Sequence, residues 1–302
     1  MTSFALSPRL ALSRGTLIGV AALSGVVALW SAFALSTRAI EGAGLTTGDA
    51  AILRFAVPAL LLTPWIPRTL RAVRGAGAGA LGLVLLAGLP HFLLFAWGAE
   101  LTSAGLTGLL VPGTVPLFVT LLLFLRHRTP VSRRRLGALA AIVVGVAASA
   151  MLRGGTADLG GVAVLLAAGL VWALYTVGLA SLRLDLVSVI VVISVTSAIV
   201  ALALAVTGVL PSHLLAGTLP APQIATYALV QGVGTGLLST ACYVLAVKHL
   251  GSSLASSAGA LSPVLTAVVA VPLLNEPLTA GLAIALALIV SGVAVFHLAP
   301  RR

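Results

Sequence analysis

The chain has 302 residues, of which 60% are hydrophobic and only 8% are charged, and its mean hydropathy is +1.20. Soluble globular proteins carry roughly 25% charged residues, so this composition excludes a soluble domain. The abundance of apolar residues also excludes intrinsic disorder. Lys and Arg number 17 against 6 Asp and Glu, a net charge of +11. In an integral membrane protein such an excess is tested against the positive-inside rule before nucleic-acid binding is considered.

Ten apolar stretches long enough to cross a bilayer follow one another along the chain. A spanning helix needs about 20 apolar residues, and the runs lack the period-two alternation of an outer-membrane barrel. We therefore expect an all-α polytopic membrane protein with ten transmembrane helices. The predicted helices cover residues 16–35, 50–67, 80–98, 104–125, 136–152, 160–181, 186–209, 223–247, 251–274 and 279–298.

The charges give this arrangement an orientation. With residues 1–15 in the cytoplasm, fourteen Lys and Arg fall in inside segments, two fall in outside loops, and Arg54 lies within a span. Five of the six acidic residues fall outside, with only Asp185 inside. The positive-inside rule then predicts a multi-pass protein of the inner (plasma) membrane with both termini in the cytoplasm. A cleaved signal peptide is the alternative for the first segment, because Ala32-Phe33-Ala34 resembles a cleavage site.

An internal repeat divides the chain into two halves. A shift of 147 positions aligns residues 116–147 with 263–294 without a gap, and ten of the 32 positions are identical. The matched prolines are the strongest evidence for the repeat, because alanine and valine matches are frequent by chance in this composition. A second alignment, at a shift of 142, places Trp30 on Trp172. The repeat predicts two units, 16–152 and 160–298, and argues against removal of the first helix.

Each unit has five helices, so the second must enter the membrane from the opposite side. The loop around Arg126–Arg135 carries five arginines, whereas its counterpart, 275–279, has no Lys or Arg and one Glu. Inverted repeats of this kind are typical of secondary transporters, which alternate access around a site near the bilayer midplane.

Several motifs resemble the EamA-type family of the drug/metabolite transporter superfamily. They are the helix 1 tryptophan, Arg54-Phe55 in helix 2, and a second-half run from Ala260-Leu261-Ser262-Pro263-Val264 through Asn275-Glu276-Pro277-Leu278-Thr279 to Ser291-Gly292-Val293. The first half departs from the family pattern at Thr129-Pro130, where Glu-Pro is usual. The resemblance covers about residues 16–298. It implies ten helices and the export or uptake of small metabolites, amino acids or drugs, without fixing a substrate.

Three polar residues interrupt the predicted spans. Arg54 lies about five residues inside its helix, roughly 7 Å along the axis, and either snorkels to the headgroups or attracts an anionic or zwitterionic substrate. His91 lies near a helix centre and either couples a proton to transport or is a neutral interhelical hydrogen-bonding group. Gln231 lies at a comparable depth, where it could place its amide opposite His91 or join helices.

Aromatic residues and prolines complete the candidate substrate pathway. Trp30, Trp172 and Tyr175 are expected to face a cavity between the repeats, although ordinary packing also explains them. Pro112, Pro116 and Pro263 free backbone carbonyls in their helices and are candidate hinges.

Other residues receive structural roles. Trp65 is expected to be an interfacial anchor, and Glu276 and Glu100 are expected to be solvated. The run Arg133-Arg134-Arg135 is a topology determinant that also suits anionic lipid. The small residues Ser252, Ser253, Ser256, Ser257 and Gly259 are expected to line one flank of helix 9 for close packing.

The function expected from these features is secondary-active transport, by export, of a small metabolite, amino acid or drug-like solute. A lipid-headgroup flippase or channel of related fold is the alternative. An intramembrane enzyme is disfavoured because no predicted span contains an acid, and an ATP-driven pump because no G-x-x-x-x-G-K-[ST] occurs. No cofactor, metal or nucleic-acid partner is expected. A coupling proton and a homodimer are left open.

Overall fold

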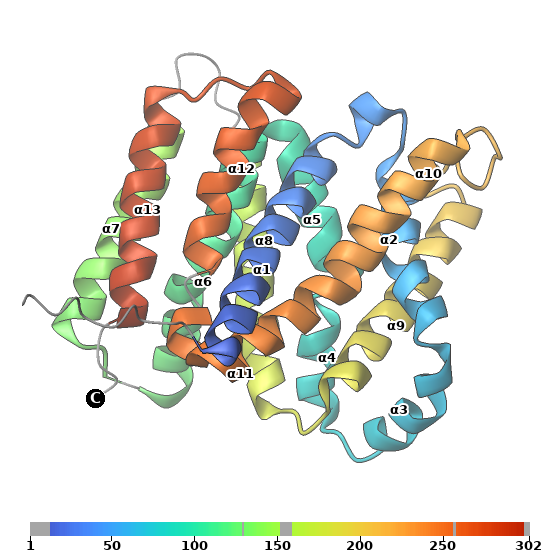
Figure 1. The fold of residues 1–302 in the computed structure, drawn as a ribbon, viewed down its shortest axis with the longest axis horizontal. Helices are drawn as coiled ribbons and strands as arrows, with labels where there is room; N and C mark the ends of the chain where they lie inside the picture. Colours follow the sequence, from blue (N-terminus) through green and yellow to red (C-terminus); the bar gives the residue numbers. More distant parts are fainter. Residues whose placement is uncertain (1–12, 129, 152–158, 256–257, 299–302) are drawn as a thin grey trace, which may run out of the picture.

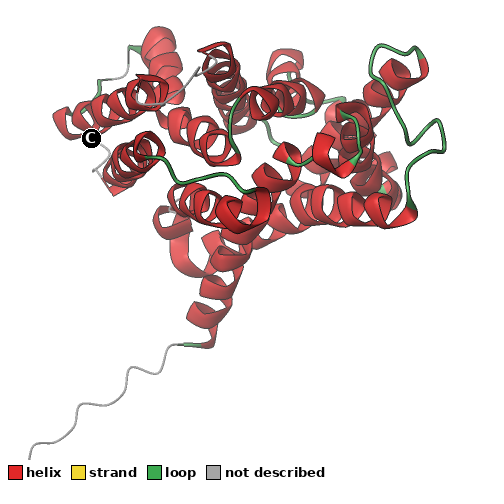
Figure 2. Cartoon of the chain, turned by 90° about the horizontal axis from the view of Figure 1, so that it is seen from above, coloured by secondary structure: helices red, strands yellow, loops and turns green. Residues whose placement is uncertain are grey.

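The computed structural model describes residues 13–128, 130–151, 159–255 and 258–298 (Figure 1). Within these ranges every regular element is helical (Figure 2). The elements are α1 (Arg14–Arg38), η1 (Glu41–Ala43), α2 (Thr47–Leu61), η2 (Thr63–Trp65), α3 (Ile66–Val73), α4 (Ala78–Leu85), α5 (Leu89–Leu101), α6 (Ala104–His127), α7 (Arg133–Met151), α8 (Leu159–Ser181), α9 (Leu186–Val206), α10 (Ala221–Tyr227), the π-helical η3 (Ala228–Leu238), α11 (Ser239–Ala255), α12 (Ala258–Leu274) and α13 (Ala280–Leu298).

Seven helical stretches of the described chain are long and apolar enough to cross a membrane. An eighth is counted if α2 and the Thr63–Val73 stretch, which bend by 63° at their junction, form one span. Leu261–Leu274 is apolar but shorter. The all-helical membrane class is therefore confirmed, whereas the count of ten spans is not established by these criteria.

One predicted boundary is wrong. The sequence placed a helix start at residue 251, but residues 251–255 end α11 and α12 begins at Ala258. Gly251 does not end α11, because an isolated glycine is tolerated within a helix. Ser252 and Ser253 therefore belong to α11, and Ser256 and Ser257 lie outside the described residues.

The predicted helix 80–98 is interrupted near its middle. Pro90 has no backbone N–H and is preceded by Gly88, whose backbone leaves the helical region at ψ −128°. The Leu89 N–H donates instead to Ser197 Oγ of α9, at 3.0 Å. This break separates α4 from α5 and puts His91 in the first turn of α5.

Helices from the two halves of the chain pack on one another throughout the bundle. α7 packs on α13, α1 on α11 and α12, α8 on α4, α5 and α6, α6 on α12, and α2 on α9 and η3. In Figure 1, α7 and α13 form one edge, and α2, α3 and α9 form the opposite edge. The main core cluster runs between these edges and contains large buried side chains such as Phe92, Leu109 and Leu165.

The α7–α13 contact is reciprocal. A Cβ added at Gly145 would lie 2.6 Å from Ile289 Cγ1, and one added at Gly292 would lie 2.9 Å from Ile142 Cγ1. These two glycines are 147 positions apart, and so are the two isoleucines. The same glycine–isoleucine contact is therefore made twice, with the helices exchanged.

Candidate functional site

A hydrogen bond between the two halves of the chain joins Arg54 of α2 to Gln231 of η3. Arg54 Nη1 donates to Gln231 Oε1 at 3.1 Å. Gln231 is fully buried, and its Nε2 donates to Ser36 Oγ at 2.8 Å and Thr37 Oγ1 at 3.0 Å. The Gln231 amide thus joins η3 to both α1 and α2. Its carbonyl oxygen accepts one hydrogen bond, and its NH₂ group donates two.

The local backbone of η3 allows this approach. π-Helical turns are rare and are often found at functional sites. Gly232 follows Gln231, and a Cβ there would lie 2.6 Å from Val57 Cβ and 2.9 Å from the Leu53 carbonyl oxygen of α2. Only a glycine therefore lets α2 lie close enough for the hydrogen bond between Arg54 and Gln231.

Aromatic rings surround the guanidinium of Arg54. Its Cζ lies 4.2 Å from the ring centre of Phe33, 5.5 Å from that of Phe55 and 5.7 Å from that of Phe92. Cation–π contacts of this kind stabilise a desolvated cation. Among the described residues no carboxylate lies within ion-pair distance of Arg54, and its shielded Nε has no hydrogen-bond partner. The site is therefore cationic and lacks an anion.

His91 lies in a second, neighbouring aromatic group. Its ring centre is 4.8 Å from that of Trp172 and 5.8 Å from that of Phe95, and Trp172 lies 5.2 Å from Tyr175. His91 is 2% exposed, and within the described chain neither ring nitrogen has a hydrogen-bond partner. Of the two alternatives that the sequence left open for Gln231, the structure shows the one that joins helices: Gln231 bonds to Arg54, Ser36 and Thr37, and not to His91.

One ring pair links the two groups. Phe33, which lies under Arg54, stacks on Phe95 with 4.5 Å between ring centres, and Phe95 adjoins His91. A continuous series of side chains thus runs from Arg54 through α1 and α5 to Trp172 and Tyr175 of α8. Five residues singled out from the sequence contribute to or adjoin this series: Arg54, Gln231, His91, Trp172 and Tyr175.

Trp30 lies apart from this series. It stacks on Tyr243 of α11, with 6.0 Å between ring centres. The sequence repeat paired Trp30 with Trp172, but the two tryptophans have different aromatic partners. Next to Trp30, Ser31 Oγ donates to the Ser262 carbonyl oxygen at 3.0 Å, immediately before Pro263 of α12. Pro112 and Pro116 lie inside α6.

An ion pair closes the end of the bundle that the sequence predicts to lie outside. Arg38 Nε at the end of α1 lies 3.0 Å from Glu276 Oε1. Glu276 Oε2 accepts from the Ala104 N–H at 2.7 Å, in the first turn of α6, where a carboxylate is favoured by the helix dipole. The expectation that Glu276 is solvated is therefore wrong: its side chain is 17% exposed and has two partners. Glu100 is exposed and accepts from Thr47 Oγ1 at 3.1 Å.

Asp49 fastens the 207–220 loop at the same end. It closes a capping box with Thr46 at the start of α2. Its Oδ1 also accepts from Ser212 Oγ at 2.6 Å and from the Leu214 N–H at 2.9 Å, and the residue is fully buried. This role of Asp49 was not predicted from the sequence. Thr46 three positions before Asp49 is the signal that could have indicated the cap, but nothing local indicates the loop.

The opposite end is held by fewer polar contacts. Arg68 Nη2 lies 3.3 Å from Asp185 Oδ2, and both side chains are well exposed. Asp185 is the N-cap of α9, and hydrogen bonds from Ser188 lower the pKa of its carboxyl, with a smaller contribution from Arg68. Trp65 is 41% exposed nearby, as an interfacial residue would be.

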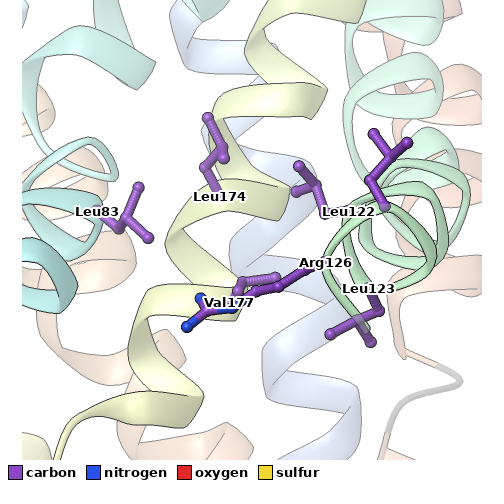
Figure 3. Close-up of a pocket in the computed structure, with 7 residues that line it drawn as sticks. Leu83, Leu122, Leu123, Arg126, Leu174 and Val177 are labelled. Atoms are coloured by element: carbon purple, nitrogen blue, oxygen red, sulfur yellow. The ribbon is translucent and has the colours of Figure 1, made fainter. Parts of the chain in front are cut away.

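Two cavities of the described structure lie away from Arg54. One, of about 340 Å³, lies between α4, α6 and α8 (Figure 3). The other, of about 230 Å³, lies between α7 and α13 and is lined by Arg134, Gly137 and Gly292, among others. Arg54 and His91 line neither of them. In the described ranges, no three His, Cys, Asp or Glu side chains are grouped to hold a metal ion.

Comparison with known proteins gives one likeness of fold and one family match to the second half of the chain. A solved crystal structure aligns over 93% of this chain and 95% of its own, with a TM-score of 0.57 and 19% sequence identity, which is a likeness of fold alone. No curated protein matches the chain. The model of the EamA-like transporter family matches residues 159–298. That match confirms the resemblance predicted from the sequence motifs, over residues 159–298.

Proposed function

We propose that the protein is a secondary-active transporter that exports a small metabolite, amino acid or drug-like solute by alternating access. In this proposal ten helices form two inverted five-helix units, 16–152 and 160–298. The protein lies in the plasma membrane, with both termini on the cytoplasmic side. The match to the EamA-like transporter family supports a membrane transporter of the drug/metabolite type. The solute and the coupling ion are left to experiment.

The packing supports two units related by a two-fold axis in the membrane plane. In a two-fold contact the same surfaces meet twice with their roles exchanged. Gly145 against Ile289 and Gly292 against Ile142 fit this description at the repeat's own spacing. Other helix pairs exchange in the same way, since α1 packs on α11, η3 and α12 as α8 packs on α4, α5 and α6.

The observation that carries the proposal is the cation between the halves. An arginine at membrane depth costs about 2.5–3.5 kcal/mol on insertion scales, and ionisable residues there mark substrate or ion pathways. Arg54 is held by Gln231 of the other half and lacks a carboxylate partner within the described chain. We infer that a carboxylate or other anionic group of the solute completes this site, with Trp172, Tyr175 and Trp30 along the pathway.

The polar contacts at the two ends suggest which conformation the protein has adopted. The outer end is closed by Arg38–Glu276 and by Asp49 with the 207–220 loop. The inner end is tied by the exposed Arg68–Asp185 pair and by Thr69 with Ser188. We infer an outward-closed state, in which Pro112, Pro116 and Pro263 would act as hinges when the halves rock.

Transport by the purified chain in proteoliposomes tests the proposal directly. A panel of carboxylate-bearing, neutral and cationic solutes is offered at several pH values, with Arg54→Ala, Arg54→Lys and His91→Ala compared with the unmodified protein. We expect uptake of an anionic or zwitterionic solute by the unmodified protein, and a transport rate at least tenfold lower in Arg54→Ala. Arg54→Lys should retain part of the transport, because lysine keeps the charge but lacks the guanidinium that bidentate recognition needs. If the transport rate of His91→Ala no longer depends on pH, His91 is the group that carries the coupling proton.

Other outcomes would contradict the proposal. Movement of fluorescent phospholipid between leaflets without solute transport would make the protein a flippase. Solute flux that never saturates with concentration would make it a channel, and hydrolysis or acyl transfer without transport would make it an enzyme.

A further inference from the structure

The groove between α4, α6 and α8 has a membrane-facing floor. Leu174 and Val177 of α8 line this floor. Leu170, which lies one turn before Leu174 on the same side of α8, is 36% exposed. The opposite face of α8 carries Leu165, which is fully buried, and Trp172, which packs on His91. The groove therefore opens outward from the bundle, away from the candidate substrate site.

Two glycines of α8 allow α4 and α6, which form the walls of the groove, to lie close to α8. A Cβ at Gly178 would lie 2.5 Å from Leu83 Cβ of α4, and one at Gly169 would contact Thr114 and Phe118 of α6. Leu83 forms one wall, and Leu122, Leu123 and Leu125 form the other. The resulting cavity, about 340 Å³, falls within the range of ligand pockets and is lined by aliphatic side chains except for one arginine.

That arginine is Arg126, at the end of α6. Figure 3 shows its side chain reaching from α6 across the groove toward α8, with the guanidinium beside Val177. The residue is exposed, and the described part of the chain gives it no ion pair or side-chain hydrogen bond. A cation with free donors therefore stands at the mouth of an aliphatic groove that faces the bilayer.

We propose that this groove is a binding site for an anionic phospholipid. An acyl chain lies along Leu83, Leu174 and Val177, and the headgroup phosphate accepts hydrogen bonds from Arg126. Basic pockets between membrane helices at the cytoplasmic side are suited to anionic headgroups, and a guanidinium matches phosphate geometry. A free phosphate would leave the aliphatic walls empty, and a zwitterionic lipid would bring its own cation close to Arg126.

The neighbouring arginine provides a matched control. Arg128 lies two residues beyond Arg126 and its Cζ is 5.6 Å from the ring centre of Phe124, but it does not line the groove. Removing either arginine changes the net charge equally. Lipid bound in the groove requires Arg126 but not Arg128. A general attraction between basic residues and anionic lipid would depend on both arginines.

Native mass spectrometry of the purified chain, with phosphatidylglycerol or phosphatidylcholine of the same acyl chains, tests the site. We expect the protein to retain phosphatidylglycerol preferentially, and Arg126→Gln to lower that preference about fivefold, the effect of one arginine near an anionic surface. Arg126→Lys and Arg128→Gln should retain most of it, and inorganic phosphate should not displace the lipid. Equal losses in Arg126→Gln and Arg128→Gln, or no loss in either, would overturn the proposal.

A second variant tests the groove independently of the charge. Leu174→Trp fills the floor while leaving Arg126 in place, and should reduce phosphatidylglycerol retention severalfold. Retention equal to that of the unmodified chain would contradict an acyl-chain site. Thermal unfolding in detergent verifies that each variant is folded.

Discussion

At the scale of single residues, the polar side chains within apolar runs were the most informative part of the sequence. Arg54, His91 and Gln231 were selected because a bilayer makes unpaired polar groups costly, and each of them is in the central packed region. Their partners were not predictable. Gln231 meets Arg54 across 177 positions of sequence because η3 packs on α2, and no local pattern encodes that contact.

Glu276 is less exposed than its position in the sequence predicts. It lies in a short loop that sequence alone marks as polar and exposed. The fold brings the end of α1 and the start of α6 to it, so its carboxylate is paired twice. Exposure is a property of the assembled bundle, and loop position alone does not determine it.

Replacing Gln231 tests the balance of charge at Arg54. Gln231→Leu leaves the guanidinium and two hydroxyl groups without their amide partner, and we expect a loss of about 1–3 kcal/mol in stability. Gln231→Glu supplies the missing anion, so we expect a folded protein that no longer transports an anionic solute. Thermal unfolding and proteoliposome transport are the two measurements. Unimpaired transport by Gln231→Glu would remove Arg54 from the solute site.

At the scale of helices, hydropathy located the apolar elements but not their internal breaks. All ten predicted stretches are helical over most of their length in the described chain. The bend after Leu61, the break at Gly88 and the π-helical η3 were not predicted. Pro58, Pro64 and Pro90 were visible, but whether a proline ends, bends or merely interrupts a helix depends on the groups that neighbouring helices supply.

The reciprocal α7–α13 contact gives a prediction about paired substitutions. Gly145→Val and Gly292→Val each push a side chain into an isoleucine of the facing helix, and overpacking of this kind costs about 1–3 kcal/mol. We expect both variants to lower the unfolding temperature by similar amounts. Gly137→Ala, on α7 with no neighbour within 4 Å of an added Cβ, is the control. A large effect at only one of the two glycines would contradict a two-fold contact.

The tie between α1, α6 and the 275–279 loop gives a second prediction at this scale. Glu276→Gln weakens the pair with Arg38 and removes the anion at the start of α6, together worth about 1 kcal/mol. We expect the outer end to open more often. Thr102, which is 9% exposed near that end, is replaced by Cys in a Cys242→Ser background, and labelling by a membrane-impermeant maleimide is measured.

The labelling rate should rise about fivefold in Glu276→Gln, the change that corresponds to 1 kcal/mol. Glu100→Gln is the control, because Glu100 contacts Thr47 within the same half. Equal labelling in the two variants would show that the Arg38–Glu276 pair does not hold the outer end closed.

At the scale of the whole molecule, the all-helical class and the similarity of residues 159–298 to the EamA-like transporter family were predictable, because composition and repeated motifs are properties of the sequence itself. The arrangement of the helices was not, since apolar faces in a bilayer are alike in hydropathy and packing decides between them. Small residues at contacts such as Gly232 and Gly292 carry that information, but only in pairs that the sequence does not reveal.

The orientation of the molecule is tested with reporters. The 14:2 distribution of Lys and Arg predicts that a reporter fused after Arg302 remains in the cytoplasm. An alkaline phosphatase fusion should be inactive there and a fluorescent protein fusion bright. An active phosphatase would contradict an even number of spans with a cytoplasmic N-terminus.

The contacts of Gly145 with Ile289 and of Gly292 with Ile142 also bear on how the two halves of the chain are held together. A surface that fits a rotated copy of itself can hold two separate molecules together before any linker joins them. The two halves of this chain, expressed as separate five-helix units, should therefore be able to pair through the same glycine–isoleucine contacts.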